Sequence, residues 1–484
     1  MEIENELSET TKSRPWISGL KFLGLGLLIL AMLTALGVFW HRDKMASKLQ
    51  QMMAEMDRTD TGWRLEDIEA ARAEVPDEDN SARVILEAAK QMPKRWPSAD
   101  FHEEHYRLPP NELVSGEDFV VLSRELASAR EALMIADKLA DMPHGRHQIH
   151  YDRNPIATLL PHLQECRNLV SLLRYEAMRR SWKGDSHSAL KYCRAALNVG
   201  RSIGDEPILI SQLVRIACNA MVCQAIEQTL GQGEPTAEDM SQLQKLLENE
   251  DKNSSLLAAM RGERAMLHKV FDGVESGEIP LNMLEGLSRG DLQSDRLKNT
   301  VIALWRMDTR EDNALFLSLM NRRIKEVQAP LHEQIALEKV WDQEVRARLA
   351  PPSRAVITRL LLPAMTKVSE AFRREHAYIR CTIVALAAER YRRDKKAWPE
   401  SVDQLCPQYL SSVPLDPYDG KPLRCKREID GLIIYSIGND GVDDGGHLDR
   451  ERISMPGVDL GLRLWDVNKR RQPSQPKPAD PNPK

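Results

Sequence analysis

Apolar residues form one unbroken run near the start of the chain, at residues 22–40 (FLGLGLLILAMLTALGVFW). The run contains no charged residue. At about 1.5 Å rise per residue, a helix of this length covers roughly 28 Å, close to the hydrocarbon thickness of a bilayer. Trp16 and Trp40 stand at its two ends, where interfacial aromatic residues are typical. The pattern predicts a transmembrane anchor over residues 16–41 that contacts the lipid bilayer through residues 22–40.

A core helix or a cleaved signal peptide would also place an apolar run here. A core helix keeps a polar face, which this run lacks. A signal peptide has a shorter apolar region and a small-residue cleavage site, whereas the charged residues 41–44 (HRDK) follow here. We therefore expect a retained anchor. Its orientation stays open, because three basic residues lie on each side: Lys12, Arg14 and Lys21 against Arg42, Lys44 and Lys48.

Helical spacing of apolar positions continues through residues 44–350, with short breaks at Gly and Pro residues. Short connections favour antiparallel helical hairpins, and we expect a helical domain over this range. The segment 184–197 (GDSHSALKYCRAAL) resembles the helix–turn–helix unit of a tetratricopeptide repeat. Because the pattern fails one period later, a repeat array, a bundle and an irregular solenoid all remain open.

The pattern changes after Pro351-Pro352. A long helix to about residue 396 is followed by a short helix at 402–406 and by two short strands, 423–427 and 432–437, around an Asp-Gly turn. Residues 353–466 are therefore predicted to form a long helix plus an α+β module, which makes the fold class mostly α. We expect the terminal segments 1–15 and 472–484 to be disordered tails.

The C-terminal motifs resemble the globular part of the major pseudopilin of type II secretion. The residues that carry the resemblance lie between about 370 and 450, in the order ERYRRDKKAWPES, VPLDPYDGKPLRC and IIYSIGNDGVDDGG. The whole chain also resembles bacterial single-pass membrane proteins that carry this module after a helical region. The resemblance implies a small antiparallel sheet behind the long helix and a calcium-binding loop.

Pilin-like assembly is not implied, because the start of the chain departs from the family. A pseudopilin has a processed Gly followed by Phe, with Glu at the fifth position at the head of the same long helix. Here Gly19 is followed by LKFL, and the module lies far from the apolar run. The resemblance therefore implies a similar fold but no assembly into a filament.

Composition narrows the class of protein. Of 484 residues, 42% are hydrophobic and 29% charged, with a mean hydropathy of −0.44. These values exclude a wholly disordered chain and a multi-span transporter. A net charge of −5 gives no basic excess, so we expect no nucleic-acid partner. The seven cysteines are irregularly spaced without a CxxC pair, which predicts no disulfide framework and leaves the compartment open.

An acidic, Gly-rich loop at residues 440–451 is the candidate metal site. Ca²⁺ prefers six to eight oxygen ligands, and such a loop can turn carboxylates onto one point. The pseudopilin resemblance implies Asp440 as a ligand, together with Asp443, Asp444 or Asp449. The alternative is a solvated acidic turn that holds no ion.

A second group of possible ligands is weaker. His144, His147 and His150, followed by Asp152, could ligate Zn²⁺. Nearby Pro and Gly residues make this a loop and the chain contains no HExxH, so we interpret it as an exposed polar loop. The Arg-rich stretches 373–374 and 390–396, with Glu370, Glu375 and Glu389, are interpreted as solvated helix faces.

Together these features predict a non-enzymatic, single-pass protein of the bacterial cytoplasmic (inner) membrane with most of the chain extracytoplasmic. It would act as a scaffold that binds protein partners through its helical domain. No nucleotide-binding or serine-hydrolase motif is present in the sequence. The alternatives are a metal-dependent hydrolase of the cell envelope that uses the His144–Asp152 loop, and an atypical secretion-system component.

Overall fold

Helices make up most of the described part of the chain, and sheet content is small, which confirms the mostly α prediction. The computed structural model describes residues 15–99, 101–253, 255–280, 309–350, 355–362, 368–453 and 455–474. The α-helices are α1 (Pro15–Thr59), α2 (Leu65–Ala70), α3 (Ser81–Lys90), α4 (Gly116–Ser128), α5 (Arg130–Ala136), α6 (Pro161–Trp182), α7 (Ser186–Arg201), α8 (Leu209–Gln232), α9 (Ala237–Asp251), α10 (Ser255–Ser276), α13 (Arg310–Glu326), α14 (Leu331–Leu349), α15 (Val356–Leu361) and α17 (Val368–Lys395). The 3-10 helices are η1 (Glu103–Tyr106), η2 (Asp137–Asp141), η3 (Pro155–Ala157), η4 (Val402–Leu405) and η5 (Val467–Lys469), and the strands are β1 (Glu112–Leu113), β2 (Arg424–Glu428), β3 (Gly431–Ser436), β4 (Leu460–Trp465) and β5 (Gln472–Pro473).

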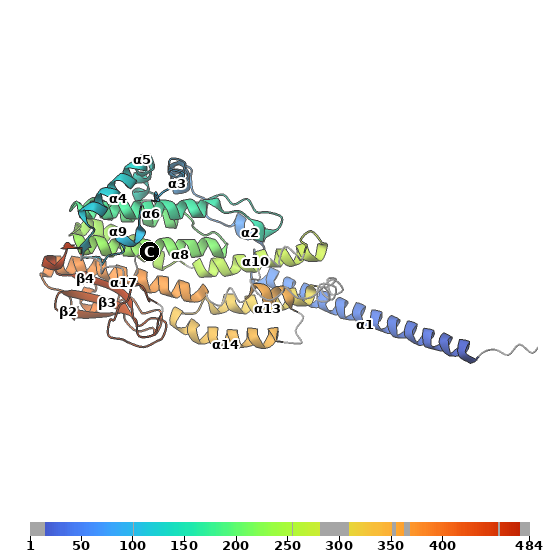
Figure 1. Ribbon diagram of the computed structural model, residues 1–484. Coiled ribbons are helices and arrows are strands. Elements are labelled where there is room, and N and C mark those ends of the chain that lie inside the picture. Colours follow the sequence, from blue (N-terminus) through green and yellow to red (C-terminus); the bar gives the residue numbers. More distant parts are fainter. Residues whose placement is uncertain are drawn as a thin grey trace, which may run out of the picture.

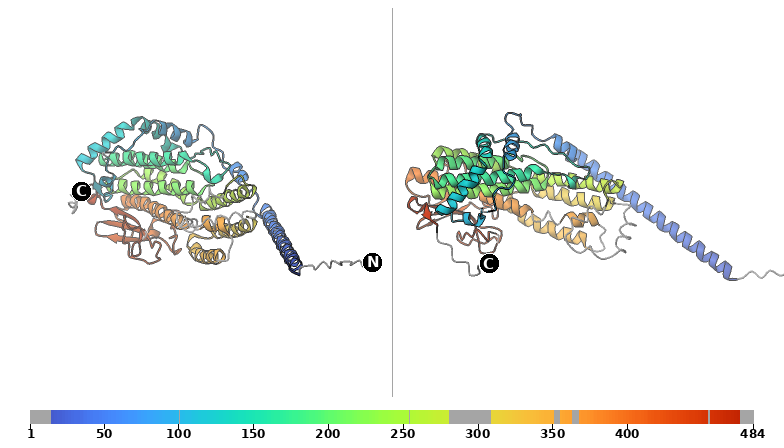
Figure 2. Two further views of the ribbon diagram at one scale, coloured as in Figure 1. Left: turned by 45° about the vertical axis from the view of Figure 1, so that its right-hand side comes forward. Right: turned by 45° about the horizontal axis from the view of Figure 1, so that its top comes forward.

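The helices stack in layers (Figures 1 and 2). Helices α3, α4 and α5 cover one side of α6 and α7, and α8 packs on the opposite side of that pair. Helix α17 lies next, against α8 and α9, with the sheet β2-β3-β4 behind it. The chain therefore places its C-terminal module directly against the helical layers.

Helix α1 leaves the body and projects beyond it (Figures 1 and 2). Near its C-terminal end Leu49 and Met56 are buried in a cluster with Phe271 of α10 and Phe316 of α13. Toward the N-terminal end, its described side chains between residues 25 and 40 are exposed. One continuous helix thus joins the apolar run to the folded body.

The α6–α7 hairpin forms at the turn expected from residues 184–185. Gly184 has a φ of 80°, a conformation that glycine adopts without the Cβ clash of other residues. The side chain of Asp185 then caps α7 by accepting a hydrogen bond from the backbone N–H of Ser188 at 3.1 Å. Small residues such as Ala189 and Ala196 are buried between the helices and allow their close approach.

The C-terminal sheet is antiparallel, with strand order β2-β3-β4. Leu432 and Ile434 of β3 stand opposite Leu464 and Leu462 of β4, and all four side chains are buried. The strands expected at 423–427 and 432–437 are present with shifts of one residue, whereas β4 was not predicted. These four side chains share one buried cluster with Leu386 of α17, so the sheet packs against that helix.

One hydrophobic core joins the helical layers to the C-terminal module. A single cluster contains Leu173 of α6, Leu243 of α9, Leu386 of α17 and Leu432 of β3. The core therefore crosses the boundary expected between the 44–350 and 353–466 units.

The start of the expected C-terminal tail is ordered. Residues 472–473 form β5, which pairs in parallel with β1, so the disordered tail predicted for 472–484 is wrong at its first residues. A backbone hydrogen bond from the Gln472 N–H to the Asn111 carbonyl fixes this pairing. The segments 1–14 and 475–484 lie outside the described residues.

The interpretation of the α17 charges as solvated is also wrong for several residues. Arg373, Glu375 and Glu389 are buried. An Arg373 Nη donates to Glu338 at 2.7 Å, and both oxygens of Glu389 accept from Arg470 at 3.0 Å. Because α17 is covered by helices on one side and by the sheet on the other, its polar residues find partners inside the protein.

Candidate functional site

Two of the four predicted calcium ligands accept hydrogen bonds from backbone N–H groups. Asp440 accepts hydrogen bonds from the N–H groups of Val442 at 3.1 Å and Gly457 at 2.9 Å. Asp449 accepts from the N–H groups of Glu451 and Arg452. The bonds from Val442 and Glu451 are typical of Asx turns, and the bond from Gly457 ties the loop to the segment before β4.

The other two predicted ligands lie beside an aspartate that sequence reasoning missed. Asp443 accepts from Tyr435 and from Arg424 Nε. One oxygen of Asp444 is buried without a hydrogen-bond partner, and the Asp444 N–H reaches Asp459 at 3.4 Å. Burial, and then the proximity of Asp443 and Asp444, raise the pKa of Asp459. These three carboxylates form the acidic cluster of the loop.

This arrangement falls short of a preformed metal centre. Within the described residues, no group of three or more His, Cys, Asp or Glu side chains is placed to hold a metal ion. Asp443 is also engaged by the Arg424 guanidinium, which partly neutralises it. Ion binding here would require the carboxylates to close around the ion.

The histidine loop is only partly the exposed polar loop that the sequence suggests. His144 and His150 are exposed, but His147 is buried. The ring of His147 stacks on His162 of α6 at 4.5 Å between centroids, and its Nε2 lies 3.0 Å from the Ser202 hydroxyl. The three predicted ligands therefore point to different environments.

Around His147 the fold assembles a buried polar cluster from distant segments. His162 pairs with the buried Glu206 at 2.9 Å, and the Cys166 sulfur lies 3.8 Å from His147 Nε2. Burial raises the pKa of the Cys166 thiol well above its usual value, which keeps it protonated and unreactive at neutral pH. The cluster is therefore a buried polar group of the core rather than a nucleophile, and its His147 Nδ1 has no hydrogen-bond partner. No spacing in the sequence could have indicated it.

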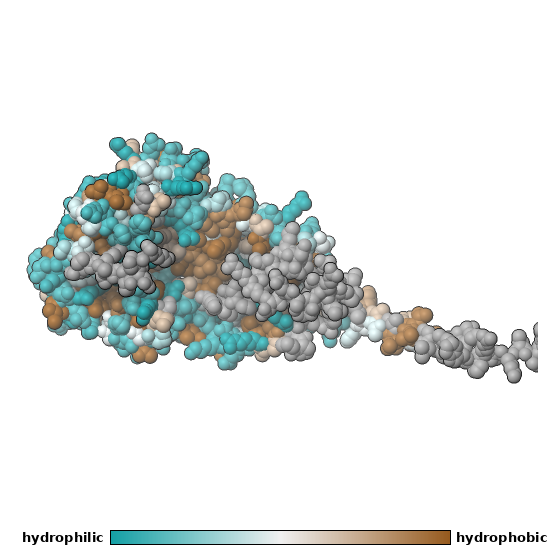
Figure 3. Space-filling model, in the orientation of Figure 1, coloured by the Kyte–Doolittle hydropathy of each residue, from teal (hydrophilic) through white to brown (hydrophobic). Residues whose placement is uncertain are grey.

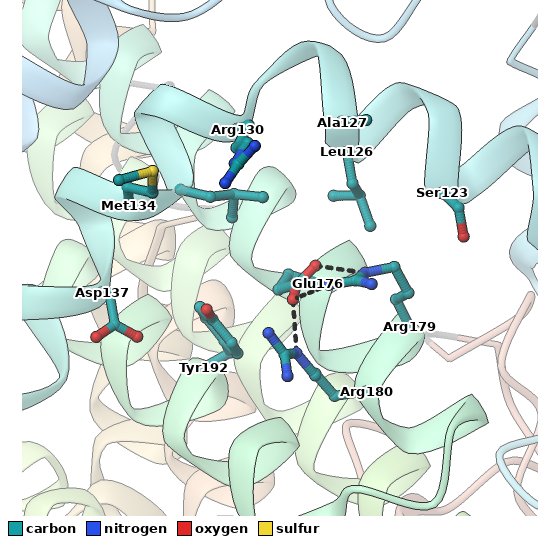
Figure 4. A pocket seen from close by; sticks show the side chains of 11 residues that line it. Ser123, Leu126, Ala127, Arg130, Met134, Asp137, Glu176, Arg179, Arg180 and Tyr192 are labelled. Atoms are coloured by element: carbon teal, nitrogen blue, oxygen red, sulfur yellow. Dashed lines mark hydrogen bonds and ion pairs between the residues drawn. The ribbon is translucent and has the colours of Figure 1, made fainter.

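A pocket of about 490 Å³ opens between the α4–α5 and α6–α7 layers (Figure 4). Its volume lies within the usual range for small-molecule sites. On one wall, Glu176 accepts hydrogen bonds from Arg179 and Arg180. Arg130 and Met134 face it from α5. This site was not among the sequence-based candidates, because five separate elements (α4, α5, η2, α6 and α7) supply its lining.

Two helices among the described residues are long and apolar enough to cross a membrane. The first is the Leu25–Thr59 part of α1, whose apolar window has no burial in the protein, and Figure 3 shows apolar residues at the surface of this projecting helix. The second is α8, which is half buried. Arg215 and Asn219 of α8 are buried and bind Glu250 of α9, which indicates a core helix.

Comparison with protein-family models, with curated proteins and with solved structures finds no match to this chain. The likeness to the pseudopilin module therefore depends on the C-terminal residues quoted above.

Proposed function

We propose that this chain is a single-pass protein of the bacterial cytoplasmic membrane whose folded body acts as a binding scaffold. The observation that supports this proposal is the exposed apolar part of α1. Leu28, Met32 and Leu36 are each more than half exposed, although they belong to a helix that is buried farther along. A surface of this kind is costly in water and favourable in lipid.

The proposal places the body on the extracytoplasmic side, which the flanking charges leave open. Reporter fusions after Lys484 test this placement. We expect a periplasm-dependent phosphatase to be active and a cytoplasm-dependent fluorescent protein to be dark. The reverse result would place the body in the cytoplasm and remove the envelope role, while leaving the anchor intact.

A scaffold is favoured over a metal-dependent hydrolase by the position of His147. A zinc site in the His144–Asp152 loop needs its imidazoles to converge, and here one faces the core while two face solvent. Zinc analysis of the purified full chain separates the two functions. Stoichiometric zinc that is lost in His144→Ala and His150→Ala would favour the hydrolase.

For the C-terminal module we propose a pseudopilin-like role as a rigid domain, without assembly into a filament. The order of long helix, η4, β-hairpin and acidic loop supports this proposal. An atypical secretion-system component would share this module. Stable co-purification with defined secretion proteins, lost when residues 397–474 are removed, would favour that alternative.

We also propose that the acidic cluster binds Ca²⁺ through Asp443, Asp444 and Asp459. The unpartnered buried oxygen of Asp444 supports the proposal, because a cation would satisfy it. Melting the full chain in millimolar CaCl₂ and in chelator should show a higher melting temperature with calcium. Asp444→Asn should abolish the shift, and Asp449→Asn, which changes a turn residue, should preserve it. An equal melting temperature in both buffers contradicts the site.

A further inference from the structure

The pocket between α4–α5 and α6–α7 has walls of opposite character. Leu126, Leu133 and Met134 supply apolar surface from one side. Met134 is 64% exposed, so a large flexible apolar side chain stands open at the pocket. Thioether side chains adapt to ligands of varied shape. The opposite wall carries Glu176 and the α6 arginines.

Most charges around the pocket are already paired. Glu176 is 1% exposed and accepts from Arg179 at 2.8 and 2.6 Å and from Arg180 at 2.7 Å. Arg180 also contacts Asp185 at 3.3 Å. Outside the lining, the Lys191 ammonium binds Asp137 at 2.7 Å.

Arg130 differs from these residues. Among the described parts of the chain it has no carboxylate or hydrogen-bond partner, although it lines the pocket beside Met134. Four cations (Arg130, Arg179, Arg180 and Lys191) stand against three carboxylates (Glu176, Asp137 and Asp185), which leaves one positive charge in surplus. A guanidinium offers two parallel donors that match a carboxylate.

We propose that this pocket binds a monoanionic carboxylate that carries an apolar group. The carboxylate pairs with Arg130, and the apolar group lies against Leu126, Leu133 and Met134. A dianion such as phosphate fits less well, because its second charge would find no free cation here. The carboxylate is either that of a small organic acid or the C-terminal carboxylate of a peptide, since both present the same chemistry.

The place of the pocket separates this ligand from the lipids around the anchor. Helices α4 and α5 lie at the end of the body opposite the projecting part of α1 (Figure 1). The pocket is therefore remote from the proposed anchor.

Titration calorimetry on the detergent-solubilised full chain tests the inference with defined probes. The probes are N-acetyl-leucine, its neutral amide N-acetyl-leucinamide, acetyl-Ala-Ala-Leu with a free C-terminus, and inorganic phosphate. We expect N-acetyl-leucine to bind at least tenfold more tightly than the amide and than phosphate. If the tripeptide binds at least tenfold more tightly still, the ligand is a peptide end. Otherwise it is a small acid, and both results support the site.

Arg130→Gln should weaken binding of N-acetyl-leucine at least tenfold without changing the melting temperature. Arg124→Gln is the matched control, because Arg124 is an exposed arginine of α4 that does not line the pocket. Met134→Ser should weaken the binding of N-acetyl-leucine, because it removes apolar contact surface. It should leave the binding of acetate unchanged, because acetate has no apolar group of that size. No carboxylate binding, equal binding of acid and amide, tighter binding of phosphate, or equal effects of the two arginine variants would each overturn the proposal.

Discussion

At the scale of single residues, His147 shows how the core controls protonation. Burial, followed by the proximity of His162 and Arg72, lowers the pKa of His147 from 6.5 to about 3. Its Nδ1 is buried without a hydrogen-bond partner. The folded protein therefore keeps this imidazole neutral. In the unfolded chain, the imidazole binds a proton once the pH falls below its ordinary pKa of 6.5.

This difference predicts an acid-sensitive fold. As pH falls from 6.5 toward 3, the unfolded state takes up a proton that the folded state does not, so the free energy of unfolding decreases. The expected slope is at most about 1.4 kcal/mol per pH unit for this group. Denaturant titrations of wild type and His147→Asn between pH 6.5 and 3 measure this slope.

The variant His147→Asn should flatten the pH dependence, because it retains polarity but cannot titrate in this range. His144→Asn, at the neighbouring exposed position, serves as the control and should follow wild type. Identical slopes for wild type and His147→Asn would show that His147 does not carry this sensitivity.

A sequence can propose candidate ligands where the candidate residues are contiguous. The acidic loop is recognisable because its aspartates lie within one short segment. Asp459 and Arg130 belong only to proposed sites, and the sequence does not mark them as candidates because their neighbours come from other elements. The buried state of His147 depends on α6 covering it, which no local pattern records.

At the scale of elements, Asp416 organises the C-terminal module. It is fully buried and accepts hydrogen bonds from the Tyr418 and Ile437 N–H groups at 2.9 Å each and from the Ser436 hydroxyl at 2.7 Å. Arg424 Nη donates to it at 2.8 Å. One carboxylate thus ties the Pro-rich turn to β2 and to the end of β3.

Asp416→Ala should destabilise the protein by about 2–4 kcal/mol, because it leaves several buried donors without an acceptor. Thermal melting or denaturant titration of the full chain measures the loss. Asp419→Ala removes a less buried partner of the same Arg424 and should cost less than about 1 kcal/mol. Equal losses in the two variants would contradict the central role of Asp416.

Elements that are set by local sequence signals are predictable. Elements that depend on tertiary packing against other segments are not. The Gly184 turn and the β2–β3 hairpin follow from glycine and Asp-Gly turn chemistry. The sequence does not predict strand β4, because the strand follows a long loop. Its alternating apolar residues indicate a strand only once they are paired with β3. The α17 charges look solvated because the sequence does not show that both faces of the helix are covered.

At the scale of the whole molecule, the shared core makes the helical layers and the C-terminal module interdependent. Ile379, Val384 and Leu386 of α17 are buried in the same cluster as the residues of α6 to α9. Removing α17 and the sheet would expose that apolar surface to water.

A truncated chain of residues 44–350, which lacks the apolar run, should therefore fail to melt cooperatively and should aggregate. Residues 44–474 should melt in one transition. Calorimetry and size-exclusion chromatography compare the two chains. Cooperative melting of residues 44–350 would show that the helical part folds on its own, and the interdependence would be refuted.

Alkaline carbonate extraction of membranes tests the proposed anchoring by α1. We predict that the full chain remains in the membrane pellet. Leu30→Arg with Leu33→Arg, two exposed positions within the apolar run, should release it, because each charge at the centre of a spanning helix costs about 2.5–3.5 kcal/mol. Recovery of the unaltered full chain in the aqueous fraction without detergent would contradict the account.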